Sequence, residues 1–429
     1  MSNLVRSIKF THLIQFVPKA DRAYLLTSLL LQLTLGLLFG HLYDTRIFMA
    51  TGYLVATGQD PYISQDLTQV FHNPAFRGMT SIGYPPPWAL ILGLIYLFSF
   101  NLFHSFLLYN LAIKLPVILA NLGLAYLVRH VLQSQGLDSN TSHKAWVFLL
   151  FNPFLLYFTT AWGQFDSLVA LLTLGSLVLL SRQRLTASSI LLAIAISLKP
   201  TPVPVVLAVV VFLWGKPWKR LAAYMGTLLV GIILLCIAPF FIFHWDASPI
   251  LLGWNAQFTV SGGMSLTTFY ELVKNTYTLP GNWWLLGILW LPLTLAAALL
   301  LPRGGHGLVD LLKHSLVLTL IFFLTRTWLS EQNLALILPV VLILAAMGEL
   351  PRLALTALWT LPLFFTIFNT SPPQLLFPTW PEQMARLLQW MDSFRSFRLV
   401  ARMLLVIPWQ VDGWWMVAGG FRRRPVKAV

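Results

Sequence analysis

Apolar residues follow one another in long runs along the whole chain, and short polar stretches separate the runs. The runs last about 15 to 23 residues, close to the roughly 20 that an α-helix needs to cross a bilayer. The sequence shows no alternation of apolar and polar positions of the kind found in membrane β-barrels, so helices must satisfy the backbone in lipid. The pattern predicts an all-α fold, a polytopic membrane helical bundle.

Basic residues lie in the turns between the runs and predict the topology, because cytoplasmic loops are rich in Lys and Arg. The first helix, Tyr24–Leu42, then leads the chain to the outer face, where Asp44 lies. The chain must be back in the cytoplasm at Arg129, so only one crossing fits between Asp44 and Arg129. Two apolar runs lie in that interval, and one of them therefore does not cross the membrane. We assign Pro85–Phe103 to the outer membrane surface as a juxtamembrane helix, because its proline-rich start gives the chain a sharp entry.

About twelve crossings result, and both termini are expected in the cytoplasm. The expected spans are Tyr24–Leu42, Ser105–Val128, Ala145–Trp162, Ser167–Leu180, Thr186–Leu198, Pro202–Trp214, Leu221–Phe243, Trp283–Leu301, His314–Thr325, Asn333–Met347, Leu353–Phe368 and Leu399–Ala418. Residues 1–243 form a first membrane module with an outer loop at 43–103, residues 244–282 form a second outer loop, and residues 283–429 form a C-terminal module. An interfacial helix is expected at Leu4–Val17.

Composition supports this prediction and excludes other classes of protein. Hydrophobic residues make up 57% of the 429 residues and charged residues only 10%, against about 25% charged residues in soluble domains. The net charge of +14 comes from short basic clusters in turns, without a basic stripe interleaved with aromatic residues, so nucleic acid is not an expected partner. The single Cys236 excludes an intrachain disulfide.

Polar residues at the outer ends of the spans are the candidates for chemistry. Asp44 follows the first helix by two residues; it is either a functional carboxylate or a solvated helix-end charge paired with Arg46. Asp60 lies in a turn, Gly58-Gln59-Asp60-Pro61-Tyr62. Gln164 and Asp166 place an amide and a carboxylate between two apolar helices at the same face.

Two cations also lie at this outer face, although Lys and Arg otherwise lie in the turns assigned to the cytoplasm. Lys199 ends the fifth span, where it either serves the site or extends to the outer headgroups. Arg326 begins a polar block that contains Glu331 and Gln332, and Arg326 with Glu331 would alternatively be a structural pair. Lys114 and Asn121 of the second span are interpreted as groups that hold helices together.

Carboxylates, amides and cations in one outer cavity fit glycosyl transfer from a phosphate leaving group. A general base takes the proton of the acceptor hydroxyl, and fixed positive charge receives the departing phosphate. The apolar spans would hold a polyprenyl tail. Acidic residues and histidines do not recur at a diagnostic spacing, so we assign no metal and no cofactor, although a divalent metal is not excluded.

The first half of the chain resembles the GT-C superfamily of integral-membrane glycosyltransferases, and within it the polyprenyl-phosphate-mannose-dependent mannosyltransferases and the first mannosyltransferase of the glycosylphosphatidylinositol pathway. Short motifs in a common order establish this resemblance: Asp44 after the first helix, Gly58 to Tyr62, Tyr84-Pro85-Pro86, Ile113-Lys114-Leu115-Pro116, Gly163-Gln164-Phe165-Asp166 and Lys199-Pro200.

The resemblance implies that Asp44 is the catalytic base and that the displacement inverts the anomeric carbon. It also implies that the outer loops form the donor and acceptor cavity. Many relatives have a second acidic residue beside the base, whereas this chain has Tyr43 and Thr45 there. The substrate-binding candidates are Asp60, Tyr62, Tyr84, Gln164, Asp166, Lys199, Arg326, Glu331 and Gln332.

The leading hypothesis is a plasma-membrane enzyme that moves one hexose, with mannose as the expected sugar, from a polyprenyl phosphate to a lipid or glycan acceptor at the outer face. One alternative is a transporter or flippase of lipid-linked sugar, which should show repeats and broken helices at the bilayer midplane. Another is a ligase that transfers a whole glycan from a polyprenyl diphosphate.

Overall fold

The computed structural model describes residues 19–256, 260–274, 278, 283–303 and 307–421 of the chain, and these residues are mostly helical. The interfacial helix expected at Leu4–Val17 lies outside the described residues. The predicted all-α class is confirmed, apart from one short parallel pairing of β1 (Gly262–Gly263) with β2 (Trp328–Leu329).

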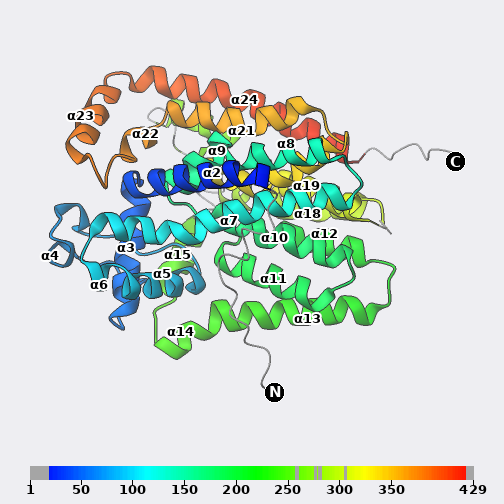
Figure 1. The fold of residues 1–429 in the computed structure, drawn as a ribbon, viewed down its shortest axis with the longest axis horizontal. Helices are drawn as coiled ribbons and strands as arrows, with labels where there is room; N and C mark the ends of the chain where they lie inside the picture. The colour runs from blue at the N-terminus through cyan, green and yellow to red at the C-terminus, as the bar shows by residue number, and fades with distance from the viewer. Residues whose placement is uncertain (1–18, 257–259, 275–277, 279–282, 304–306, 422–429) are drawn as a thin grey trace.

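Long helices lie side by side and run across Figure 1. They are α2 (Lys19–Leu38), α7 (Phe106–Ser134), α8 (Ser139–Leu150), α10 (Asp166–Ser181), α11 (Leu185–Leu198), α12 (Val203–Leu213), α13 (Trp218–Ile232), α18 (Trp290–Leu300), α19 (Leu308–Thr325), α20 (Leu338–Ala346), α21 (Arg352–Ile367) and α24 (Arg395–Gly420). Several continue into a neighbouring short segment: α9 (Pro153–Leu155) and the π-helix η2 (Leu156–Ala161) after α8, the π-helix η3 (Ile233–Ile237) and α14 (Ala238–Phe243) after α13, α17 (Trp284–Ile288) before α18, and the 3-10 helix η5 (Glu331–Leu336) before α20.

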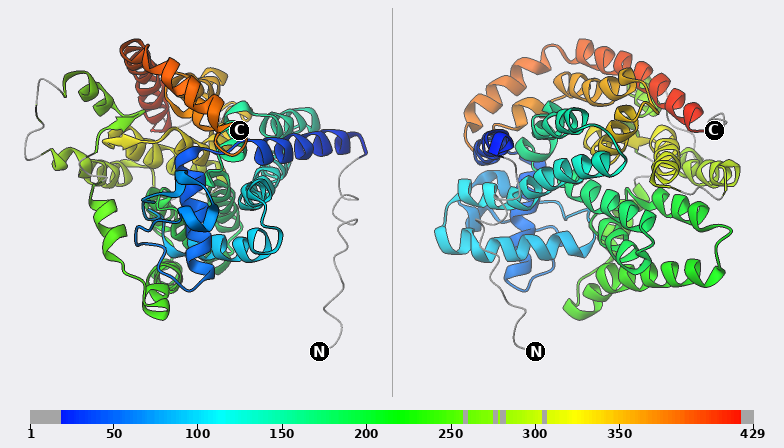
Figure 2. Two further views of the ribbon diagram at one scale, coloured as in Figure 1. Left: turned by 90° about the vertical axis from the view of Figure 1, so that its left-hand side faces the viewer. Right: turned by 45° about the vertical axis from the view of Figure 1, so that its right-hand side comes forward.

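The other helices form the connections. They are α3 (Leu42–Ala56), α4 (Thr68–Phe71), η1 (Pro74–Phe76), α5 (Pro86–Phe98), α6 (Phe100–Phe103), α15 (Ser248–Ala256), η4 (Leu266–Phe269), α16 (Tyr270–Val273), α22 (Ser371–Gln374) and α23 (Pro381–Asp392). In Figure 1, α3 to α6, α22 and α23 gather at the left-hand end of the long helices, and the left view of Figure 2 faces this end. We call it the Asp44 end, because Asp44 lies in the first turn of α3.

Five helices among the described residues are long and apolar enough to cross a membrane: Pro86–Phe103, Phe106–Ser134, Ser139–Ala161, Trp218–Phe243 and Leu308–Thr325. Shorter apolar helices lie between them, so an integral membrane protein is supported, whereas the count of about twelve crossings stays a prediction. By length and composition Pro86–Phe103 also qualifies as a span. The structure divides it at Ser99 into α5 and α6 and packs α5 along α3, so its predicted surface position remains a prediction as well.

Arg129 and Arg182, which belong to two predicted cytoplasmic turns, lie at the end opposite Asp44. Arg129 near the end of α7 pairs with Asp21 at the start of α2, with 2.6 Å between Nη1 and Oδ2. The neighbouring His130 contacts Arg182 after α10, at 3.0 Å. α2 and α7 are therefore antiparallel, and α10 begins at the Asp44 end.

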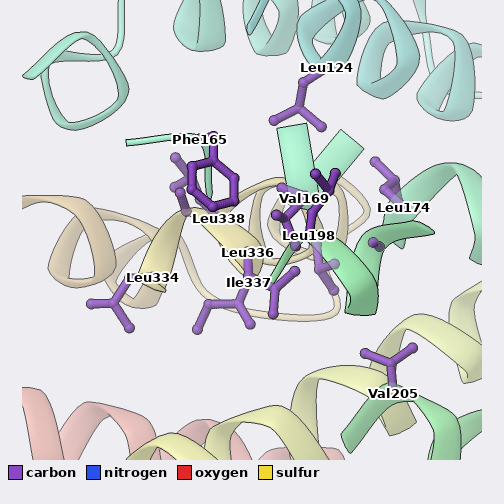
Figure 3. Packing of buried hydrophobic residues seen from close by; sticks show 14 of the residues in the cluster. Leu124, Phe165, Val169, Leu174, Leu198, Val205, Leu334, Leu336, Ile337 and Leu338 are labelled. Carbon is purple, nitrogen blue, oxygen red and sulfur yellow. The ribbon is translucent and has the colours of Figure 1, made fainter. Parts of the chain in front are cut away.

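Buried aliphatic and aromatic side chains join the helices into one core. Val169 of α10 and Phe165, the residue just before this helix, lie beside Leu334 to Leu338 of η5 and α20. They also lie beside Leu198 at the end of α11 (Figure 3). In lipid the hydrophobic effect does not favour helix association, so close packing of this kind must contribute through dispersion forces.

The first helix ends earlier than the apolar pattern predicts, because side chains from α7 bind its last carbonyl groups. α2 ends at Leu38 instead of Leu42. Asn110 Nδ2 donates to the carbonyl oxygens of Gly36, Leu37 and Phe39 at 2.8, 3.2 and 2.9 Å. The unsatisfied carbonyls at a helix C-terminus need such donors.

Lys114 binds the ends of two helices at once. Its buried Nζ donates to Gly36 O and Ala161 O, both at 3.1 Å, and to Phe39 O. A cation is favourable at a helix C-terminus, and here one cation serves both α2 and η2. The interpretation of Lys114 as a group that holds helices together agrees with these contacts. Asn121 is placed in the same way and donates to Gln32, Thr159 and Thr160.

We expect Lys114→Met to lower the stability of the protein more than any change of an exposed lysine. The variant leaves Ala161 O without its side-chain donor and removes one of the two donors to Gly36 O and to Phe39 O, which keep Asn110. A buried unsatisfied group costs about 1–3 kcal/mol. Thermal unfolding in detergent measures the effect, with the exposed Lys219→Met as the control. Equal melting temperatures for the two variants would contradict this role of Lys114.

Candidate active site

A three-residue turn between α2 and α3 brings Asp44 to the ends of two other helices. Gly40 N donates to Leu375 O at 2.8 Å, and His41 N donates to Trp162 O at 3.3 Å. A side chain at Gly40 would meet Asn110 Oδ1 at 2.7 Å, so this close approach requires glycine. The turn therefore holds His41 against the end of η2, and α3 starts directly after it.

Asp44 receives contacts from three side chains. Trp162 Nε1 donates to Oδ2 at 2.5 Å, and Gln164 also hydrogen-bonds the carboxylate. His41 Nδ1 lies 3.3 Å from Oδ2, an ion-pair contact, and its ring stacks on Trp162 with 3.9 Å between centroids. The carboxylate is thus oriented by two ring systems that are packed against each other.

The environment of Asp44 favours its ionised form. Burial raises the pKa of this carboxyl, but the contacts with His41, Trp162 and Gln164 together outweigh burial, and the pKa lies below its ordinary value of 3.8. The position in the first turn of α3 acts in the same direction, because the helix dipole stabilises negative charge there. The side chain is 14% exposed, so a hydroxyl group of a ligand could reach an ionised base.

Tyr84 and Tyr62 form the next layer of the site. Tyr84 Oη donates to Gln164 Oε1 at 3.2 Å, which leaves the Gln164 amide to serve Asp44. Burial, with Asp44 and Asp166 nearby, raises the pKa of Tyr84 well above 10, so the phenol stays neutral and donates. Tyr62 Oη in turn donates to Tyr84 O at 3.0 Å. Tyr84 and Gln164 thus form a hydrogen-bonded chain to Asp44, and Tyr62 holds the backbone of Tyr84.

Asp60 shapes the turn that presents Tyr62 and makes no contact with Asp44. Its Oδ1 accepts from Tyr62 N at 2.8 Å, and its Oδ2 accepts from Asp246 N at 2.6 Å. The second contact ties the predicted first outer loop, 43–103, to the loop at 244–282. Asp60 thus has a positioning function in the structure.

Asp166 and Lys199 form a buried ion pair beside Tyr84. Lys199 Nζ donates to both carboxylate oxygens of Asp166 at 2.8 Å, and it lies 5.5 Å from the centre of the Tyr84 ring. Lys199 therefore does not extend to headgroups. Its charge is neutralised by Asp166 and supports the Tyr84 side of the site.

Arg326 forms no ion pair with Glu331 or with the carboxylates of this cluster in the described part of the chain. Among the described residues its guanidinium has no hydrogen-bond or ion-pair partner, and it lies 4.8 Å from the centre of the Phe322 ring. Burial lowers the pKa of Arg326 to about 10, so it keeps its charge at neutral pH. Glu331 instead interacts with Arg402 and Asn369, and Gln332 is buried next to it in η5.

Arg46 does not neutralise Asp44. Its Nε donates to Leu42 O at 3.0 Å, and its Nη1 donates to Ala75 O, so the guanidinium holds η1 against α3. The described residues thus show no Asp44–Arg46 ion pair. His41 and Trp162 contact the Asp44 carboxylate instead.

Sequence reasoning missed His41 and Trp162 as parts of the site. His41 precedes Asp44 by three residues, a spacing from which a contact could have been predicted. Trp162 lies 118 positions away, and no local pattern marks its indole as the donor to Asp44. Within the described residues, no group of three His, Cys, Asp or Glu side chains gathers in a way that could hold a metal.

Comparison with known proteins places the chain among glycosyltransferases. The model of glycosyltransferase family 87 matches residues 83–327, more than half of the chain. A crystal structure of ArnT from Cupriavidus metallidurans bound to undecaprenyl phosphate is similar with a TM-score of 0.47 and 15% identity, over 94% of this chain and 76% of that one. The chain matches no curated protein.

We expect the contribution of Asp44 to stability to depend on pH. Because its folded-state pKa is lowered, the ionised carboxylate stabilises the fold above the ordinary pKa of 3.8, and this contribution is lost as the pH falls through the folded-state value. The melting temperature of Asp44→Asn should therefore lie below that of the native protein at pH 7 and approach it on acidification toward pH 3. A difference that grows on acidification would contradict the lowered pKa.

Proposed function

Because the chain belongs to glycosyltransferase family 87, we propose that it transfers a single hexose, mannose in the first instance, from a polyprenyl phosphate to a lipid or glycan acceptor. The observation that supports this most is the oriented, ionised carboxylate of Asp44. It is partly exposed and receives hydrogen bonds from Trp162 and Gln164. Such a group can accept a proton from a hydroxyl that attacks a sugar.

In the proposed reaction the acceptor hydroxyl oxygen attacks the anomeric carbon of the donor. The bond from this carbon to the phosphate oxygen breaks, the polyprenyl phosphate leaves with the electron pair, and Asp44 takes the hydroxyl proton. Attack from the side opposite the leaving group inverts the configuration. No metal is required in this scheme.

Arg326 is our candidate for the donor phosphate. It is a charged guanidinium that has no partner among the described residues, and the planar fork of arginine fits phosphate oxygens. Lys199 is less suited to this function, since both of its contacts go to Asp166. Lys199 and Asp166 are proposed to hold Tyr84, and through Gln164 the base, in position.

The active site is proposed to lie at the outer face of the plasma membrane, with both termini in the cytoplasm. The basic turn residues Arg129 and Arg182 lie at the end of the bundle opposite Asp44, and the positive-inside rule favours the cytoplasm for that end. The sugar phosphate would then sit at headgroup level, while the polyprenyl tail lies along the apolar helices.

We expect Asp44→Asn to lower transfer about 10²- to 10⁴-fold, the usual contribution of a general base, while donor binding persists. The assay supplies radiolabelled polyprenyl-phosphate mannose and a pooled membrane-lipid extract to the purified protein, and it measures product and bound donor.

The exposed carboxylate Asp66 lies in the same loop and serves as the control, since Asp66→Asn should transfer as the native protein does. Transfer that survives Asp44→Asn would refute the mechanism. Binding without transfer by native protein and variants alike would instead count against a transferase that uses this donor, and donor translocation in vesicles would then test the flippase alternative.

A further inference from the structure

A second group of buried polar side chains surrounds Glu331 and has no function in the scheme above. Glu331, the first residue of η5, is 6% exposed, and its Oε1 has no hydrogen-bond partner among the described residues. Asn369, after α21, hydrogen-bonds the same carboxylate, and Arg402 of α24 provides the nearby positive charge. Three other parts of the chain thus converge on Glu331, because Tyr157 of η2 also lies within its electrostatic reach.

The partners of Glu331 are themselves incompletely satisfied. Arg402 Nε and Tyr157 Oη are both buried without a hydrogen-bond partner in the described structure. A buried unsatisfied donor or acceptor costs about 1–3 kcal/mol, and three in one place are unusual in a native protein. Such a cluster indicates that a polar ligand or ordered water completes it.

The cluster is connected to the catalytic base by aromatic rings. The Tyr157 ring meets the Trp162 ring edge-on, with 6.1 Å between centroids, and Trp162 donates to Asp44. A ligand that contacts Tyr157 and Glu331 would therefore lie one aromatic ring away from the proposed reaction centre.

The chemistry of the three side chains selects the class of ligand. A carboxylate would repel a phosphate, a guanidinium would repel a metal ion, and neither suits an apolar tail. Carboxylate, guanidinium and phenol together offer acceptors and donors for neighbouring hydroxyl groups. Burial raises the pKa of Glu331 to about 7, so near neutral pH this carboxyl can accept from a hydroxyl or donate to one.

We propose that Glu331, Arg402 and Tyr157 form a subsite for the vicinal hydroxyls of a sugar ring, separated from the proposed base Asp44 by the Trp162 ring. The proposal rests on the proposed function, since the sugar is either the hexose of the donor or a sugar of the acceptor. In both cases the subsite selects the sugar by its hydroxyls and does not take part in the displacement.

The test compares native protein with Glu331→Gln and Tyr157→Phe and uses three radiolabelled probes: polyprenyl-phosphate mannose, polyprenyl phosphate and octyl mannoside. If the subsite holds the donor hexose, each variant should bind both mannose-bearing probes about tenfold or more weakly and polyprenyl phosphate unchanged, since a hydrogen bond to a charged group contributes about tenfold or more in affinity. If it holds a sugar of the acceptor, donor binding should persist while the KM for the acceptor rises about tenfold.

A matched control is available in Glu349, another buried carboxylate, which pairs with Lys313 at 2.6 Å. Glu349→Gln should leave the three affinities and the acceptor KM unchanged, and melting temperatures show whether each variant is folded. Affinities and an acceptor KM within twofold of the native values in both folded variants would overturn the subsite. If the native protein does not transfer, failure of that protein to bind octyl mannoside would also overturn it. Octyl mannoside binding that depends on Glu331 in such a protein would support the subsite while the proposed transfer fails.

Discussion

The ammonium group of Lys114 is the contact on which the site depends. It joins the last turn of α2 to the last turn of η2, and through these two ends it sets the distance between His41 and Trp162. The stacked rings then leave one place for the carboxylate of Asp44, against the indole nitrogen. Gly163 contributes to the same arrangement, since its φ of +100° favours glycine and a Cβ there would meet Lys114 Cε at 3.1 Å. A buried cation that binds the carbonyl groups at the ends of α2 and η2 thus fixes these two helix ends relative to each other, and the site is built on them.

Two carboxylates of the same kind acquire different functions from their surroundings. Asp44 and Asp166 each lie in the first turn of a helix. Asp166 is closed off by both of its contacts with Lys199, whereas Asp44 is held by neutral donors and an imidazole and keeps a partly exposed edge. Because the charge of Asp166 is neutralised by Lys199, this pair stabilises the structure. Asp44, which is held by neutral donors, remains able to accept a proton.

The helical class, Asp44 and the grouping of Tyr84, Gln164 and Asp166 could be predicted, because apolar runs and helix-end polar residues are local features of the sequence. The early end of α2 could not be predicted, because it results from Asn110 and Lys114 on another helix. The partners of the charged side chains could not be predicted either. Arg326 and Glu331 lie five positions apart, yet Glu331 interacts with Arg402, which is distant in sequence and arrives only when α24 packs against the rest of the bundle.

The most direct measurement of the central claim is a structure of the protein with a non-transferable phosphonate analogue of polyprenyl-phosphate mannose. We expect the anomeric carbon to lie at the Asp44 end, with its face opposite the phosphonate open toward the Asp44 carboxylate, so that an acceptor hydroxyl fits between them at about 3 Å from an Oδ atom. The phosphonate should lie near Arg326. A donor bound with its sugar at the opposite end, near Arg129, or with the phosphonate between Asp44 and the sugar, would contradict the role of Asp44 as the base.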